Sequence, residues 1–346
     1  MSVINMKKIR DGVIAHRLAA GVASLAALAM ITAGGVAVAN AMNEAKALSE
    51  FNYAGYDAAQ IKAIADCISG VSSDCPNGHD RAGWQQWAED SLNSDANNKG
   101  TMSLVDTKGQ NRTISIRLIG INHDDRADGK GKAGLTFQAT GSYTDHAMNS
   151  STTTTTNRGG WRDSDMRQWL NTTVLDSNES VKNNVTPVVK MTNNDGYVSG
   201  VDNNNEAGST APTGTVDKIW LASPVEMDMP SVRRSVSTGE SVKNARPSGG
   251  DFQYSYNSYS YWYGYNDYDL AGKPYEYWSK NATSGQKYKE LFAISSGGSS
   301  SYYRYPWLRS PSPAGSDSFA YFLGYYGYLS YYGATATDGV VPALSF

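Results

Sequence analysis

The polarity pattern of the first forty residues is typical of an export or membrane segment. Residues 18–39 form an uncharged, Ala-rich apolar run that is long enough to cross a bilayer as a helix. Four basic residues precede it, namely Lys7, Lys8, Arg10 and Arg17. Two interpretations stay open: its small-x-small ending favours a cleaved signal peptide, whereas its length favours an uncleaved anchor. Both interpretations export everything after residue 41.

The next segment has the apolar spacing of helices. Between residues 42 and 95 apolar positions recur every three to four residues, and Asp57 and Asp80 precede two of the runs as suitable N-caps. A turn-rich stretch at 94–100 follows. We therefore expect residues 42–100 to form a small helical stalk.

From Thr101 onward the spacing changes to that of short strands separated by loops. The pattern predicts a hairpin over 101–121, a strand over 135–140, a helix over 162–175 and a buried strand running into a turn over 217–227. Asp163 or Ser164 is the expected cap of that helix.

Charge and motifs exclude several function classes. The net charge is −3, and because the first 41 residues carry +3, the remainder carries −6. Such a chain has no basic footprint, so we expect no nucleic-acid partner. A G-x-G-x-x-G match at 129–134 lacks the strand–helix context of a dinucleotide site, and no hydrolase elbow, zinc-protease or Walker motif occurs. We expect no catalytic residue, no metal and no cofactor.

The two cysteines, Cys67 and Cys75, follow a predicted helix closely. Export would favour a disulfide between them that staples this loop locally, and two free thiols remain the alternative.

Tyrosine is concentrated near the C-terminus. Nineteen of the 23 tyrosines lie between Tyr254 and Tyr332, among Ser, Gly, Asn and Asp. A buried core would need a hydrogen-bond partner for each hydroxyl, whereas this mixture is typical of binding surfaces, where Tyr gives rigid contact area. Tandem tyrosines in a strand expose at least one ring of each pair. A stabilising aromatic ladder and a low-complexity segment are the alternatives.

Four segments resemble, in order, the motifs of a bacterial surface-protein domain family. They are Arg162–Asn171, Asp217–Glu226, Trp307–Pro311 and Gly339–Leu344. That family is similar to C-type-lectin folds of the formylglycine-generating-enzyme type. The resemblance implies an α+β fold with short antiparallel sheets and long loops over residues 101–346, and a ligand-binding surface near the C-terminus. The enzyme branch needs a cysteine within this domain, and neither cysteine lies there, so we expect no enzyme. The implied framework positions are Trp169, Trp220, Trp307, Arg309, Gly339 and Pro342.

Residues 300–346 also resemble the variable region of target proteins of diversity-generating retroelements. Adenine mutagenesis in those elements turns Asn codons into codons for Tyr, Ser, Asp, Ala, Leu or Phe. The resemblance implies ligand contacts at Tyr302, Tyr303, Tyr321, Leu323, Tyr325, Tyr326, Tyr328, Ser330, Tyr331 and Tyr332.

The sequence thus predicts an exported protein displayed at the cell surface, either membrane-anchored or secreted. Residues 1–41 would be the signal peptide or anchor, 42–100 the stalk and 101–346 the ligand-binding domain, whose partner would be a surface protein or a glycan. An uncleaved N-terminal helix would also contact the membrane. The alternative is a structural pilus or appendage subunit, or a tip adhesin; an exported glycan hydrolase is disfavoured because no acidic pair stands out.

Overall fold

Two units make up the chain, and they divide between Ser49 and Glu50. The computed structural model describes residues 35–150, 156–192, 194, 213–228, 255–256, 259–260, 273–280, 288, 291, 305–311, 318–323 and 328–346. Helix α2 (Gly35–Glu50) accounts for the described part of the first unit. None of the helices in these ranges is long and apolar enough to cross a membrane. Most of the apolar run at 18–39 lies outside the described residues.

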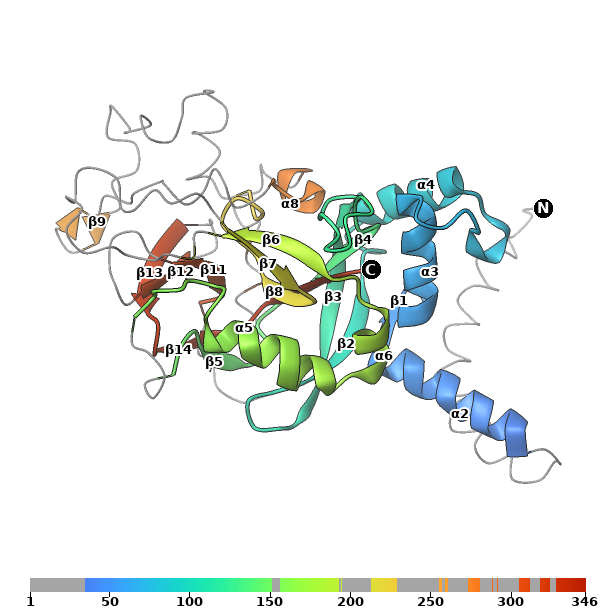
Figure 1. Cartoon of the computed structure of the whole chain (residues 1–346), viewed down its shortest axis with the longest axis horizontal. Helices are drawn as coiled ribbons and strands as arrows, with labels where there is room; N and C mark the ends of the chain where they lie inside the picture. Colours follow the sequence, from blue (N-terminus) through green and yellow to red (C-terminus); the bar gives the residue numbers. More distant parts are fainter. Residues whose placement is uncertain are drawn as a thin grey trace, which may run out of the picture. The chain divides into compact units, whose positions relative to one another are not determined.

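A six-stranded antiparallel sheet forms the centre of the second unit (Figure 1). Its strands, in spatial order, are β1 (Phe51–Tyr53), β2 (Gly100–Val105), β3 (Asn111–Ile121), β4 (Leu135–Ala139), β15 (Pro342–Ser345) and β8 (Ile219–Leu221). The last strand of the chain is therefore hydrogen-bonded on both sides, to β4 and to β8. The predicted hairpin over 101–121 is confirmed as β2 and β3, and the strand over 135–140 as β4.

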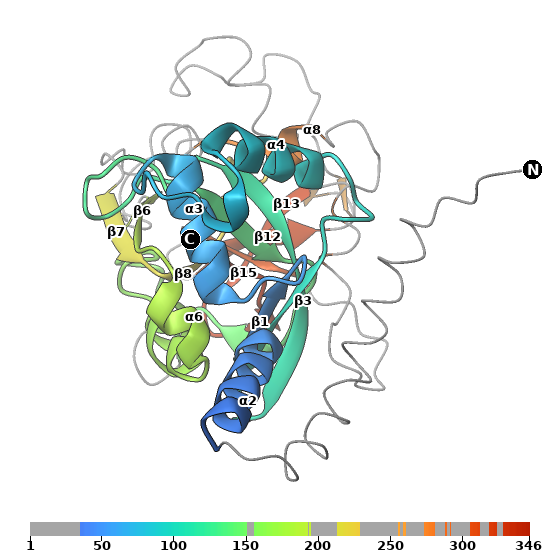
Figure 2. The same ribbon diagram turned by 90° about the vertical axis from the view of Figure 1, so that its right-hand side faces the viewer.

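Helices α3 (Ala58–Ser69) and α4 (Arg81–Leu92) lie against this sheet (Figure 2). Both begin where the sequence predicts. The Asp57 side chain accepts a hydrogen bond from the Gln60 amide, and the Gln60 side chain accepts one from the Asp57 amide. At the second helix the Asp80 carboxylate accepts from the Gly83 amide. Their apolar faces supply Ile61, Ile64 and Trp84 to the core, all at most 1% exposed.

The segment expected as a separate helical stalk belongs largely to this unit. The helical spacing over 42–95 predicts a helix at Phe51, but helix α2 ends at Glu50 and β1 joins the sheet beside β2. Phe51 and Tyr53 are fully buried in the same core as Phe137 and Phe346. The compact unit that holds the central sheet thus begins at Glu50, and these aromatic rings belong to its core.

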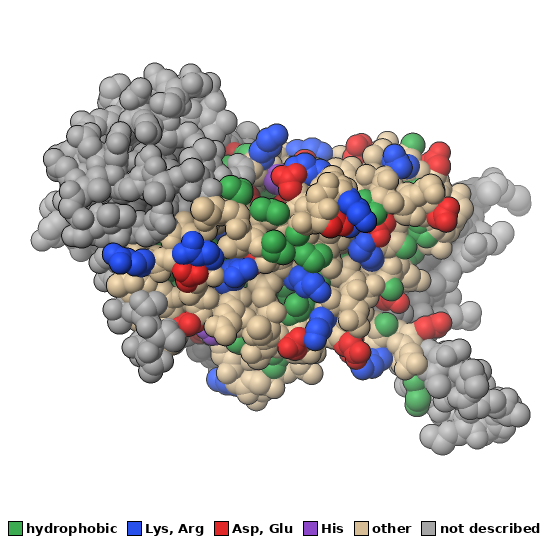
Figure 3. All heavy atoms as spheres, in the orientation of Figure 1, with side chains coloured by type: hydrophobic (Ala, Val, Ile, Leu, Met, Phe, Trp, Pro, Cys, Tyr) green, Lys and Arg blue, Asp and Glu red, His purple; other side chains and the backbone are tan. Residues whose placement is uncertain are grey.

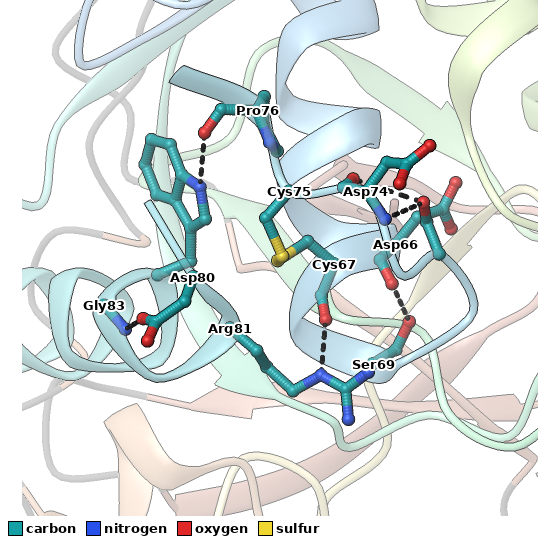
Figure 4. Close-up of a disulfide and its surroundings, with 11 residues drawn as sticks. Asp66, Cys67, Ser69, Asp74, Cys75, Pro76, Asp80, Arg81 and Gly83 are labelled. Atoms are coloured by element: carbon teal, nitrogen blue, oxygen red, sulfur yellow. Dashed lines mark hydrogen bonds between the residues drawn. A yellow bond between two sulfur atoms is a disulfide. The ribbon is translucent and has the colours of Figure 1, made fainter. Parts of the chain in front are cut away.

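A disulfide joins Cys67, near the end of α3, to Cys75 (Figure 4). The predicted bridge is therefore confirmed, and the alternative of two free thiols is wrong. Arg81 donates from Nε to the Cys67 carbonyl at 3.0 Å, and the indole of Trp84 donates to the Pro76 carbonyl at 3.1 Å. These bonds satisfy backbone carbonyls at the turn that the disulfide closes and tie it to α4.

The remaining elements surround the central sheet. They include β5 (Asp145–Ala147), α5 (Asp165–Trp169), α6 (Glu179–Asn184), β6 (Val188–Thr192), β7 (Thr213–Asp217), α8 (Glu276–Lys280) and β14 (Thr337–Gly339), together with the two-residue strands β9 (Ser255–Tyr256) and β10 (Tyr259–Ser260). Ser164 caps α5 by accepting from the Arg167 amide, and a π-helical turn over Leu170–Val174 continues the helix predicted for 162–175. The second unit is thus a mixed fold of helices and short antiparallel sheets, as predicted.

Candidate functional site

All six of the predicted ligand-contact positions that are described lie in one small sheet. Strands β11 (Trp307–Pro311), β12 (Ser318–Leu323) and β13 (Tyr328–Gly333) are antiparallel and in this order (Figure 1). The register pairs Tyr321 with Ser330, Leu323 with Tyr328 and Ala320 with Tyr331. Tyr302, Tyr303, Tyr325 and Tyr326 lie outside the described residues.

Tyr332 is an exposed aromatic residue of this sheet. The residue is 51% exposed, and its ring stacks on Trp307, with ring centroids 6.4 Å apart and planes 28° from parallel. Trp307 is 1% exposed, and its indole nitrogen donates to the His146 carbonyl at 2.9 Å. Phe319, opposite Tyr332 in the register, is fully buried. The tandem pair Tyr331-Tyr332 is thus extended, and one ring reaches solvent as predicted for such pairs.

A neighbouring tyrosine borders the same region. Tyr305 is 36% exposed, and its amide donates to the Asp338 carboxylate at 2.8 Å. Its carbonyl accepts from Gly339 at 3.2 Å, and Pro306 bridges to Gly339. The framework position Gly339 therefore attaches the segment before β11 to β14 by main-chain bonds.

Three tyrosines of the C-terminal block are anchors in the core instead of surface residues. Tyr275 donates to the Asp124 carboxylate at 3.0 Å, Tyr277 accepts from Arg117, and Tyr288 donates to the carbonyls of Met227 and Asp228 at 2.8 and 2.9 Å. All three are at most 6% exposed. The expectation that this block avoids the core is wrong at these positions, because each hydroxyl finds a buried partner. The amino-acid composition around these three tyrosines does not distinguish them from the other tyrosines of the block.

A buried network of charges lies beneath β11. Arg309, fully buried, pairs with both carboxylate oxygens of Glu226, which follows β8. Lys190 of β6 lies 2.7 Å from Glu226 Oε1 and 2.6 Å from Asp124 Oδ1. Sequence reasoning chose Arg309 as framework but missed the rest of the network, since Glu226, Lys190 and Asp124 lie between 83 and 185 positions from Arg309 in the chain.

The electrostatics of this network favour its ionised form. Burial disfavours the Asp124 carboxylate, but the charge of Lys190 and the nearby His123 outweigh it and hold the pKa of Asp124 far below its usual range. Burial acts to raise the pKa of Glu226 as well, but the charges of Arg309 and Lys190 outweigh it and hold this pKa below its usual value. The four charges balance, which is the condition under which buried ions persist.

The other framework positions are structural as well. Trp220 is fully buried under Lys190, whose Nζ lies 4.5 Å from the ring centroid. Trp169 is half-buried and stacks on His146 with centroids 4.4 Å apart. Pro342 is buried in β15 opposite Leu221. Trp220 and Pro342 therefore lie in the central sheet, and Trp169 packs against β5.

Within the described ranges no group of His, Cys, Asp and Glu is arranged to hold a metal ion. The oxygens of Asp124 are occupied by Lys190, Tyr275, Thr136 and Ser345, and Asp128 pairs with Arg126.

A second exposed apolar surface lies on the β6–β7 hairpin. Val216 is 56% exposed and Met191 37% exposed. Figure 3 shows hydrophobic side chains among Lys and Arg side chains on this face. Val216 therefore offers a reference position for substitutions at an exposed site far along the chain from Tyr332.

Residues 142–346 match the model of a family described as a domain of unknown function (DUF6273). The chain belongs to this family. The DUF6273 region contains all four motifs noted in the sequence, together with the Arg309–Glu226 pair and the sheet β11–β12–β13. Strands β1 to β4 precede the DUF6273 region, so the central sheet combines strands from inside and outside it. No curated protein and no solved structure matches the chain. The resemblance to C-type-lectin folds and to retroelement target proteins stays a prediction.

Proposed function

We propose that this protein is an exported binding protein, displayed at the cell surface, whose C-terminal sheet contacts a surface protein or a glycan. The observation that carries the proposal is the half-exposed ring of Tyr332, stacked on the buried indole of Trp307. A tyrosine backed by a fixed ring presents a large contact area with little conformational entropy to lose on binding. No chemistry is required of such a site.

The backbone register supports extending the contact surface along both strands. Positions 319, 321 and 323 of β12 pair with 332, 330 and 328 of β13. Tyr321, Tyr328 and Ser330 therefore hold register positions along the same two strands as the pair Phe319–Tyr332. We include the other predicted positions, Leu323 and Tyr331 of these strands and Tyr302, Tyr303, Tyr325 and Tyr326, in the proposed contact set.

The disulfide supports the proposed export. Bridges such as Cys67–Cys75 form and persist in oxidising compartments and are rare in the cytosol. N-terminal sequencing of the protein from the membrane and extracellular fractions would separate a cleaved signal peptide from an anchor. Recovery of the protein in the cytosol with both thiols free would contradict export.

Substitution of the exposed tyrosines tests the binding face. The purified protein would be applied to a glycan array and to a panel of intact bacterial and host cells. If Tyr332 is a binding hot spot, Tyr332→Ala should weaken any captured interaction by roughly 30-fold or more, corresponding to about 2 kcal/mol. The melting temperature should change little, since the ring is half-exposed.

The control is Val216→Ala, which shortens an exposed apolar side chain on the β6–β7 hairpin and should leave binding unchanged. Unchanged binding by Tyr332→Ala together with a large loss of stability would contradict the proposal and favour an aromatic ladder.

Diversification by a retroelement is a separate part of the proposal. Sequencing of the gene and its surroundings in several isolates should reveal a near-copy of the region for residues 300–346 that differs at adenines, beside a reverse-transcriptase gene. Invariant tyrosine codons without such a copy would point to one fixed ligand.

Helix α2 favours a second candidate, a pilus or appendage subunit. This helix of sixteen residues begins within the apolar run of residues 18–39 and ends at Glu50, where the second unit begins. Electron microscopy of sheared cell-surface material should then show filaments that contain this chain, and a tip location would combine both proposals.

A further inference from the structure

A lysine and two carboxylates from distant parts of the chain meet in the core. Lys190 Nζ lies 2.6 Å from Asp124 Oδ1 and 2.7 Å from Glu226 Oε1. The side chains of all three are at most 3% exposed. Asp124 follows β3, whereas Lys190 lies in β6 and Glu226 follows β8, so the contact joins three separate segments.

Aromatic rings enclose the amine. Nζ of Lys190 lies 4.5 Å from the centroid of Trp220 and 5.4 Å from that of Tyr275, and both rings are fully buried. Removing an ammonium and a carboxylate from water is costly, whereas a neutral amide of the same atoms carries no such penalty. The opposite charges of the network offset this cost in the ionised form, and condensation would remove one positive and one negative charge together with their desolvation penalty.

We propose that Lys190 and Asp124 condense to an intramolecular isopeptide bond, with Glu226 placed to accept the proton from the amine. This site does not depend on the proposed binding function, because it lies in the core.

The step balances without a co-reactant. Lys190 Nζ gives one proton to Glu226 Oε1, and its lone pair forms a bond to Asp124 Cγ. The bond from Cγ to Oδ1 then breaks, and Oδ1 leaves as water with the proton held by Glu226 and a second proton from Nζ. An ammonium and a carboxylate become one amide and one water, and Glu226 returns to its starting state.

Hydroxyl groups surround the reacting carboxyl group. Thr136 Oγ1 donates to Asp124 Oδ2 at 2.6 Å, and Ser345 Oγ does so at 3.2 Å. These donors would stabilise negative charge that develops on Oδ2 when the amine attacks Cγ. Tyr275 donates to Oδ1 at 3.0 Å and can assist its departure. Arg309 holds the Glu226 carboxylate by both oxygens, so that Oε1 stays beside the amine.

Peptide mapping of the full-length wild-type chain tests the proposal directly. Trypsin releases Asp124 in the peptide 118–126, and it cannot cleave after a lysine whose amine is acylated. The amide should therefore appear as a branched peptide that joins 118–126 to 183–218, lighter than the sum of the two by one water. Recovery of 118–126 and 183–190 as separate linear peptides would overturn the proposal and leave an ion pair only.

Two variants sharpen the result. Asp124→Asn should give the same branched peptide, because attack on the carboxamide releases ammonia and leaves the identical amide. Lys190→Arg keeps the positive charge but has no amine to acylate, so it should give separate peptides. A branched species at these positions in Lys190→Arg would show that the cross-link arises elsewhere and would also overturn the proposal.

Discussion

Arg309 of β11 and Glu226 in the turn after β8 form a fully buried ion pair. The two terminal nitrogens of the guanidinium, Nη1 and Nη2, each donate to one carboxylate oxygen. Arg309 also donates to the Leu221 carbonyl at 3.0 Å and to Thr192 Oγ1 at 2.9 Å. One side chain thus joins the C-terminal sheet to the central sheet and to β6. Trp307, on which the ring of Tyr332 stacks, is the first residue of the same strand as Arg309.

Removal of one partner of this pair should be strongly destabilising. Arg309→Met leaves the Glu226 carboxylate buried without its main partner, and we expect a loss of about 3–5 kcal/mol in the free energy of unfolding. Urea unfolding followed by tryptophan fluorescence would measure it.

The matched control is Arg162→Met, which removes a surface arginine paired with Asp163, the two side chains being 46% and 54% exposed. It should cost less than about 1 kcal/mol. Equal losses in the two variants would show that burial does not determine the contribution of these pairs.

The disulfide should contribute measurably although it closes a short loop. In the chain-entropy model, replacing Cys67 and Cys75 by serine should lower the free energy of unfolding by about 2–3 kcal/mol. Wild-type protein treated with a reductant should show the same loss, whereas the double variant should not respond to the reductant. A response of the double variant would show that the reductant acts elsewhere.

His146 should make the protein less stable in mild acid. Burial lowers the pKa of His146, although the Ala147 carbonyl and Asp165 act in the opposite direction. The folded form therefore binds its proton less readily than the unfolded chain does. The free energy of unfolding should fall as the pH drops below about 6.5, where an unfolded histidine becomes protonated.

Urea unfolding at several pH values would test this in the wild type and in His146→Gln. The variant should show a flatter dependence between about pH 7.5 and 5.5. Parallel curves for the two proteins would show that His146 does not cause the loss.

The tyrosine hydroxyls should separate into structural and exposed groups. Tyr288→Phe removes a buried hydroxyl that contacts the Met227 and Asp228 carbonyls, and we expect a loss of about 0.5–1.5 kcal/mol in stability. Tyr332→Phe makes the same chemical change on a half-exposed ring and should change stability by only a few tenths of a kcal/mol. Thermal unfolding of the two variants side by side provides the comparison, and similar losses would contradict the division.

Local signals in the sequence determined the local elements. Asp57 and Asp80 cap helices at the predicted positions, and a turn at Lys108-Gly109 joins the two strands of the predicted hairpin. Capping and turn formation involve residues a few positions apart, so the sequence contains what is needed to predict them. The Cys67–Cys75 bridge belongs to the same class, because its partners are close in the chain.

Long-range contacts decided the rest. Phe51 joins a strand instead of a helix because its ring is buried against Phe137 and Phe346. Whether a tyrosine of the C-terminal block is an anchor or a surface residue depends on the partner it meets: Tyr275 meets Asp124, whereas Tyr332 lies over Trp307 and reaches solvent. The sequence by itself determined which residue types are present and where helices and turns begin. Only the tertiary structure decided which charges and rings are brought together, because the burial of these groups depends on segments that are distant in the sequence, such as Tyr275 and Asp124.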